Sequence, residues 1–455
     1  MRVRFVLPAL FLLAGACTGS SARIVPSASP APIPPTSSPS LSGGPPLYLD
    51  VVAATDASND GPDAVNDETY LEGMRFAVQV LNDRGGVGGR LLQLRLHDDG
   101  GDLDRSTKAI GSLLDSGATA ILYVGPGPAL SPLRERFAEA GTPVVLMGGD
   151  LYTSRRMFPQ VFQTTIPWEW QAKVIAKYLV TDRKAKDIVF VGSGPEASEA
   201  AASTGQWLEY WGGSLAGSYL TPPAGVRPPS KPASGADAAI VFGTPYDAHA
   251  EVASLVSGAP RPRISGGESL LAPVEGFDRP PDGTTACYPY TWVGWAQPIR
   301  RVGAFVASFE ASAGRPPNGL EQEGYDAIEA LAYALGRDGL EGGRSLASAL
   351  EGIHDRAFSG FPIDLGPDDH LFLPRDELGL FAVPGPNERL DPWQSPTDPD
   401  LWRPVMRTFT YDGRRDDILD QDRPVFFPGW GKNQPGPYYW KSRYGIVSKP
   451  KDPVH

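Results

Sequence analysis

The alternation of short apolar runs with helical segments from Leu47 onward constrains the fold of this chain more than any other feature. The runs "LYLDVVAA", "LLQLRLHDD", "ATAILYVG" and "TPVVLMGG" have the length and composition of strands. Between them, apolar residues recur at helical spacing, as in "YLEGMRFAVQVLNDR". Repeated strand–helix units with apolar strands predict a parallel sheet covered by helices on both faces. Loops at the carboxyl ends of such strands are where these sheets bind ligands.

The glycine-rich stretch "LNDRGGVGGRLLQLRLHDD" raises the question of a phosphate-binding loop. A dinucleotide fingerprint needs a strand, then the glycines, then a helix whose N–H groups face the phosphate. Here a helix precedes the glycines and a strand follows them, and no Lys-Ser or Lys-Thr pair is present. The pattern therefore favours a structural turn, with Gly85 or Gly86 as a left-handed helix cap.

The N-terminus has the features of an export signal. Arg2 and Arg4 precede the apolar run "FVLPALFLLAGA", which is too short to span a bilayer. The run ends in "AGAC", which resembles a bacterial lipobox and implies a diacylglyceryl group on Cys17; ordinary signal cleavage beside an incidental cysteine is the alternative. Residues 18–46 are rich in Pro and Ser and predict an extended tether. We therefore expect a chain anchored by lipid on the extracytoplasmic face of a bacterial membrane.

Composition and residue spacing argue against several classes of function. A formal net charge of −12 disfavours nucleic acid as a partner. Cys287, the only other cysteine, lies in an apolar run and is interpreted as buried and inert. The sequence around Ser193 lacks a nucleophile elbow, the five histidines have no metal-ligand spacing, and "LHDDGGDLD" lacks the residue order of a calcium loop. We expect no catalytic residues, no metal and no cofactor, and assign the carboxylates of that segment to solvated or capping roles.

Three blocks carry a resemblance to a known family: "EGMRFAVQVLNDRGGVGGRLLQLRLHDD", "VFQTTIPWEWQAKVIAKYLV" and "EGYDAIEALAYAL". They resemble the leucine/isoleucine/valine-binding protein family of ABC-transporter substrate-binding proteins, and the likeness covers most of Leu47 to about Asp368. The resemblance implies two α/β lobes, each a doubly wound parallel sheet, joined by a hinge of three crossing segments. It also implies a small ligand clamped between the lobes and an ABC permease as partner.

The same resemblance sets the expected domains. After the signal peptide and lipidated Cys17 (1–17) and the tether (18–46), lobe 1 is expected at 47–167 plus 292–355. Lobe 2 is expected at 168–291 plus 356–385. Residues 386–455 form an atypical, aromatic-rich extension that is expected to wrap the lobes rather than offer a partner surface. Within it, "PVMRTFTYDG" resembles the last strand of the family.

The expected ligand site on lobe 1 departs from the family pattern. The loop "GPGPALS" occupies the place of the carboxylate-binding loop, with Ser131 as the expected cap of the following helix. The family's serine falls near Gly127 to Ala129, so its hydroxyl is missing. In "MGGDLYT", Asp150 follows Gly149 where the family has a threonine. A negative charge there opposes an α-carboxylate, unless Asp150 merely caps its loop.

On lobe 2 the resemblance places Glu268 where the family has the glutamate that accepts a ligand ammonium; a surface carboxylate is the alternative. Tyr246 falls near an aromatic residue that contacts the ligand, although both Tyr246 and Trp168 also suit packing. Together these residues favour a ligand of amino or amide character. A tethered sensor or scaffold of the same fold, and a hydrolytic enzyme, are the competing classes.

Overall fold

The structure is a computed structural model of the chain. It describes the following residues: 44–55, 62–149, 158–165, 167–194, 196–221, 235–257, 261–271, 280–281, 283–289, 299–340, 342–354, 356–360, 362–367, 369–372, 378–382 and 403–407. Cys17, where lipidation is predicted, the predicted tether up to residue 43, Asp150 and most of the C-terminal extension lie outside these ranges.

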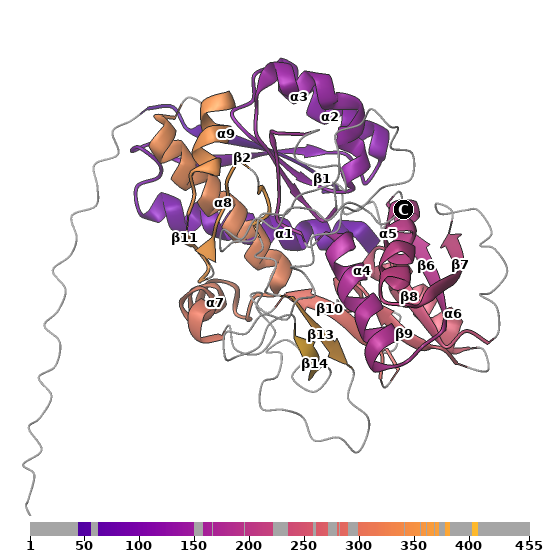
Figure 1. The fold of residues 1–455 in the computed structure, drawn as a ribbon. Helices are drawn as coiled ribbons and strands as arrows, with labels where there is room; N and C mark the ends of the chain where they lie inside the picture. The colour runs from indigo at the N-terminus through magenta and orange to yellow at the C-terminus, as the bar shows by residue number, and fades with distance from the viewer. Residues whose placement is uncertain are drawn as a thin grey trace, which may run out of the picture. The chain divides into compact units, whose positions relative to one another are not determined.

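The first lobe is a parallel five-stranded sheet with helices on both faces (Figure 1). Its strands, in the order β2-β1-β3-β4-β5, are Leu92–Asp98, Leu47–Ala53, Ile121–Val124, Val144–Met147 and Val161–Gln163. Its helical elements are α1 (Pro62–Asp83), α2 (Leu103–Asp115), the 3₁₀ turn η1 (Gly127–Leu133), α3 (Arg134–Ala140), α7 (Ile299–Ala313), α8 (Gly319–Asp338) and α9 (Gly343–Glu351).

Alternation along β1 divides the core of this lobe into two layers, because successive side chains of a strand point to opposite faces. Leu49 and Val51 belong to the cluster formed with α1 and α8, whereas Val52 belongs to the cluster formed with α2 and α3. All three side chains are fully buried. The strand is therefore covered on both faces, as its apolar sequence predicted.

The second lobe contains a seven-stranded mixed sheet. In the order β14-β13-β10-β9-β8-β6-β7, its strands are Arg403–Arg407, Leu378–Ala382, Thr285–Pro289, Arg263–Gly266, Ala238–Phe242, Asp187–Ser193 and Ser214–Thr221. Strands β6 to β10 are parallel, and β13 and β14 join antiparallel at one edge. The helical elements are α4 (Trp168–Lys177), the π turn η2 (Tyr178–Asp182), α5 (Ala197–Tyr210), α6 (Pro245–Val256) and η3 (Glu268–Leu271). The predicted α/β class with two doubly wound lobes is confirmed.

The glycine-rich turn after α1 is structural, as predicted. Gly85 and Gly86 have φ of 98° and 72°, and the Gly86 N–H closes the helix end by donating to the Leu81 carbonyl at 2.9 Å. Asn82 then pairs with the backbone of the following strand: its side chain donates to the Leu92 carbonyl (2.9 Å) and accepts from the Leu92 N–H (2.8 Å). Both ends of the turn are fixed by hydrogen bonds to neighbouring backbone.

Two local predictions were wrong. Ser131 does not cap a helix, because η1 already includes it and α3 begins only at Arg134, after Leu133. The family resemblance places 356–385 in lobe 2, but the apolar residues Ile363, Leu365 and Phe372 of this segment lie in the core of the first lobe. Hydrogen bonds explain this packing. The Ser359 N–H and hydroxyl donate to Asp326 of α8, both at 2.8 Å, and the Phe372 N–H donates to the Gln163 carbonyl of β5 at 2.9 Å.

Other expectations agree with the structure. Cys287 is fully buried in β10. The strand expected in "PVMRTFTYDG" exists as β14, which pairs with β13. Asp102 caps α2 by accepting from the Arg105 N–H at 2.8 Å, consistent with the capping role assigned to its segment.

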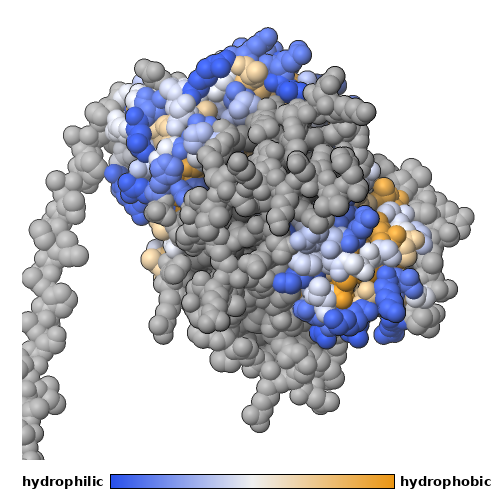
Figure 2. Space-filling model, viewed as in Figure 1, coloured by the Kyte–Doolittle hydropathy of each residue, from blue (hydrophilic) through white to orange (hydrophobic). Residues whose placement is uncertain are grey.

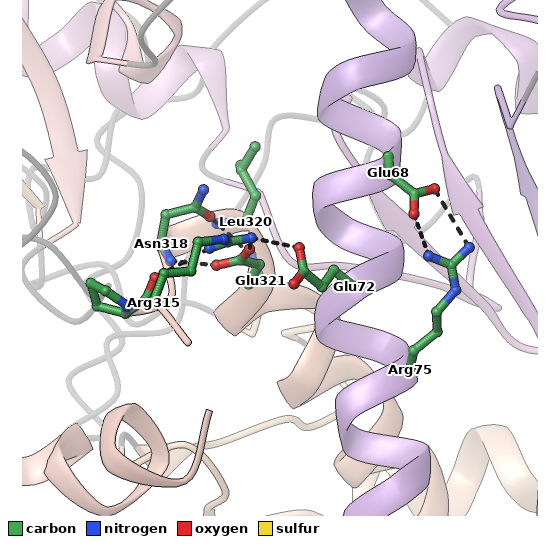
Figure 3. A network of polar contacts seen from close by, with 8 residues as sticks. Glu68, Glu72, Arg75, Arg315, Asn318, Leu320 and Glu321 are labelled. Atoms are coloured by element: carbon green, nitrogen blue, oxygen red, sulfur yellow. Dashed lines mark hydrogen bonds and ion pairs between the residues drawn. The ribbon is translucent and has the colours of Figure 1, made fainter. Parts of the chain in front are cut away.

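Helices α1 and α8 approach each other at two glycines. A Cβ added at Gly73 would lie 2.0 Å from the backbone oxygen of Glu321, and one added at Gly324 would lie 2.3 Å from that of Tyr70. The contact is extended by Arg315, which pairs with Glu72 of α1 (2.5 Å) and with the buried Glu321 of α8 (Figure 3). Burial raises the pKa of Glu321, and the Arg315 pair opposes this rise.

On the face shown in Figure 2, the coloured residues are mostly hydrophilic, with smaller apolar areas between them. Among the helices that the structure describes, none is long and apolar enough to cross a membrane.

Candidate functional site

In each sheet, the strand order has one point from which the chain continues to neighbouring strands on either side, so that the loops leaving these strands separate. In the first sheet β1 lies between β2 and β3, and in the second β6 lies between β7 and β8. In open α/β sheets, ligands bind outside the carboxyl ends of the strands at such a switch point. On the first lobe this position is formed by Ala54 and the loop after β3. On the second it is formed by Ser193, Glu196 and the loop after β8.

The loops after β3 and β4 bring two of the predicted site residues, Gly127 and Gly149, into close contact. Gly125 has a φ of 155°, and its N–H donates to the Met147 carbonyl at 2.9 Å. A Cβ added at Gly149 would lie 2.2 Å from the Gly125 oxygen and 2.8 Å from the Gly127 nitrogen. Gly149 therefore lets the two loops touch through their backbones, and it brings Gly127 and Gly149 together at the end of β3 and β4.

Ala129 has a different environment from that expected of a ligand contact. Its side chain is fully buried in the core between the sheet and α2, and its carbonyl accepts from the Thr107 hydroxyl at 2.9 Å. Its N–H donates to the Pro126 carbonyl at 3.2 Å. Ala129 thus holds the shape of the loop.

The predicted residues of lobe 2 lie on separate elements. Tyr246 lies in the first turn of α6 with 42 % of its surface exposed, whereas Trp168 stacks on Phe242 with ring centroids 5.0 Å apart. Glu268 begins η3 directly after β9. The Glu268 side chain and the whole of Asp150 lie outside the described part of the chain.

A hydrogen bond joins the two switch points. The Gly127 N–H of the first lobe donates to Glu196 Oε1 of the second lobe at 2.8 Å. Glu196 is 6 % exposed and directly precedes α5. The family resemblance assigns this loop to the binding of a ligand carboxylate. Here the carboxylate of Glu196 already accepts from one of its N–H groups, that of Gly127.

The hydroxyl of Tyr123 donates to the Pro126 carbonyl at 3.2 Å, and the charges of further carboxylates act on it. Burial raises the pKa of Tyr123, and the charges of Asp99, Glu196 and Asp67 raise it further. Asp67 accepts from the Ala54 N–H at 2.7 Å. Burial raises the pKa of Asp99, whereas hydrogen bonds from the Ser106 hydroxyl (2.6 Å) and the Gly101 N–H (2.9 Å) lower it. The first switch point is thus lined by acidic groups.

Ser193, at the end of β6, adds a buried hydroxyl. It is 4 % exposed, and within the described residues its Oγ has no hydrogen-bond partner. A Cβ added at Gly243, at the end of the neighbouring β8, would lie 2.2 Å from this oxygen. The Oγ therefore lies between the ends of the two strands that form the second switch point.

Glu196, Ser193 and Tyr123 were not predicted as site residues. The sequence around Ser193 argues against a nucleophile and does not by itself indicate a binding role. The signal that identifies all three is the strand order, since Tyr123 and Ser193 lie in the last two residues of β3 and β6, and Glu196 follows β6.

In the described ranges, no group of three or more His, Cys, Asp or Glu side chains is arranged to hold a metal ion.

Comparison with known proteins agrees with the architecture. A Leu/Ile/Val-binding protein homologue from Brucella melitensis is 26 % identical over 147 residues, which span 32 % of this chain and 39 % of that protein. The chain thus matches about two fifths of the length of that relative. A substrate-binding protein from Desulfitobacterium hafniense, solved in complex with Leu, superposes with a TM-score of 0.59 at 18 % identity over 79 % of this chain and 99 % of that one. A solute-binding protein from Rhodopseudomonas palustris, solved in complex with 3,4-dihydroxybenzoic acid, superposes with a TM-score of 0.62 at 16 % identity. The match covers 81 % of this chain and 98 % of that one.

Residues 53–374 match the periplasmic binding protein family, and this range includes both switch points. This chain belongs to the periplasmic binding protein family.

Proposed function

We propose that the chain is an extracytoplasmic solute-binding protein that holds a small ligand between its two lobes and delivers it to an ABC importer. The observation that carries the proposal is the hydrogen bond between Gly127 and Glu196, because it joins the two positions at which such sheets bind ligands. The structures of relatives with bound Leu and 3,4-dihydroxybenzoic acid support a small organic solute as the class of ligand.

In this proposal Gly149 and Asp150 supply contacts on the first lobe, and Gly127 lies beside them and holds the Glu196 carboxylate there. Glu268 and Tyr246 supply contacts on the second. Ala129 contributes by shaping its loop rather than by touching the ligand. The acidic groups favour a ligand with amino or amide character, because a buried positive group requires a charged partner.

The first experiment is a thermal-shift screen of amino acids, amides, polyamines and small carboxylates. Wild type is expected to be stabilised by members of the amino or amide classes, since a ligand that binds only the folded state raises the melting temperature. Glu268→Gln is expected to weaken that binding about 10- to 100-fold, because it removes a charge-assisted hydrogen bond. Asp150→Thr is expected to weaken the binding of cationic ligands and to reduce the exclusion of aliphatic amino acids, because it removes a negative charge.

Equal melting shifts in all three proteins would show that neither residue contacts the ligand. A complete lack of response in wild type across all four classes of compound would contradict the proposed function itself.

We also propose that the chain is a lipoprotein attached through Cys17, with residues 18–46 as its tether. This attachment keeps the binding lobes near a membrane permease, and it needs no spanning helix.

A further inference from the structure

The Glu196 carboxylate is the least expected feature of the site. A ligand with its own carboxylate would compete with Glu196 for the N–H of Gly127, since both groups are acceptors of the same kind. If a ligand carboxylate entered the site while Glu196 stayed in place, two desolvated anions would lie side by side and repel each other.

We propose that Glu196 stands in for a ligand carboxylate, so that the site selects organic cations without a free carboxylate, namely primary amines and amino amides. This inference rests on the proposed function and specifies its substrate class. Glu196 is a specificity-determining residue in this account: it fills a donor on the first lobe and presents negative charge to the ligand.

Other negative charges of the site also favour a positively charged ligand. Asp67 and Asp99 are 8 % and 2 % exposed, and both lie within electrostatic range of the Tyr123 hydroxyl, as does Glu196. Arg105 is the positive group that acts on Asp99, and its guanidinium also donates to the Gly100 carbonyl at 3.4 Å. The charges of Asp67, Asp99 and Glu196 all act on the Tyr123 hydroxyl, so a positive group bound beside that hydroxyl would be favoured by all three.

The hydroxyl of Ser193 is an independent indication of a polar ligand. A buried hydroxyl that lacks a hydrogen bond costs free energy, and such groups are rare in folded proteins. Ser193 ends β6 and lies beside the end of β8, and Glu196 follows it in the connection from β6 to α5. An ammonium or amide N–H donating to the Ser193 Oγ would satisfy this group.

The test uses matched pairs that differ only at the carboxylate: glycine and glycinamide, alanine and alaninamide, leucine and leucinamide, phenylalanine and phenylalaninamide. Isothermal titration calorimetry measures the affinity of wild type and of Glu196→Gln for both members of each pair. A third protein, Glu209→Gln, controls for loss of one charge, because Glu209 is an exposed residue near the far end of the same helix.

Wild type and Glu209→Gln are expected to bind at least one amide about tenfold or more tightly than the matching amino acid. In Glu196→Gln the affinity for the amide is expected to fall about 10- to 100-fold and the affinity for the matching amino acid to rise. The preference for the amide should therefore disappear or reverse. Glu196→Asp retains the charge and is expected to retain the preference for the amide. Melting curves without ligand verify that each variant folds.

A wild-type preference for the amino acid of any binding pair overturns the inference, as does an unchanged preference in folded Glu196→Gln. In either case a small solute still binds, so the proposed function survives. If no pair binds to wild type, the named ligand class is wrong. The broader screen then decides the proposed function, since binding of another class retains it and no binding at all refutes it.

Discussion

Gly73→Ala is expected to lower the free energy of unfolding by about 2 kcal/mol or more. The new Cβ would lie 2.0 Å from the backbone oxygen of Glu321, so α1 and α8 must separate before the methyl group fits. Overpacking of this kind costs about 1–3 kcal/mol and occasionally more. The cost exceeds the ~1 kcal/mol by which Ala is a better helix former than Gly. Gly324→Ala should behave alike, because its Cβ would meet the backbone of Tyr70.

Gly336→Ala is the matched control, at a glycine of α8 like Gly324. Its Cβ would meet only a methyl group of Val87 at 3.8 Å, which is an ordinary contact. Helix propensity should therefore stabilise this variant by up to ~1 kcal/mol. Urea unfolding of the three variants gives the comparison directly. Equal stability of Gly73→Ala and Gly336→Ala would show that α1 and α8 do not pack at the distance described.

Cys17→Ser is expected to convert a membrane-attached protein into a released one. The hydroxyl cannot form the thioether that carries the diacylglyceryl group, and attachment by lipid provides the anchor in this account. Lipid labelling followed by separation of membrane and soluble fractions measures the change. Cys287→Ser serves as the control, because Cys287 is fully buried in β10 and its loss should leave attachment intact. Persistent membrane attachment of folded Cys17→Ser would reject the lipoprotein proposal.

Much of the fold was predictable because local patterns carry it. The apolar strands buried on both faces, the helix periodicity through Leu71 and Met74, and the turn at Gly85 and Gly86 are each encoded in a few neighbouring residues. The assignment of 356–372 failed because it depends on contacts distant in sequence. Ser359 is held by Asp326, and no periodicity in the segment itself indicates that partner.

The site was less predictable for the same reason. Gly127 and Gly149 were identified from a family pattern, and the structure brings them together because Gly149 lacks a Cβ. Glu196 and Gly127 are separated by 69 positions and meet only through the order of strands in two sheets. A glutamate before a helix reads in sequence as an ordinary favourable charge at a helix N-terminus, so its burial at a switch point was not foreseen.

Hydrogen–deuterium exchange, with and without a saturating ligand from the screen, tests the central claim most directly. A ligand held between the lobes should slow amide exchange in two separate regions: the loop of residues 125–129 on the first lobe, and the ends of β6 and β8 on the second. Protection of both regions at the same ligand concentration is the predicted result. Protection confined to one lobe, or located away from the strand ends, would contradict binding between the lobes.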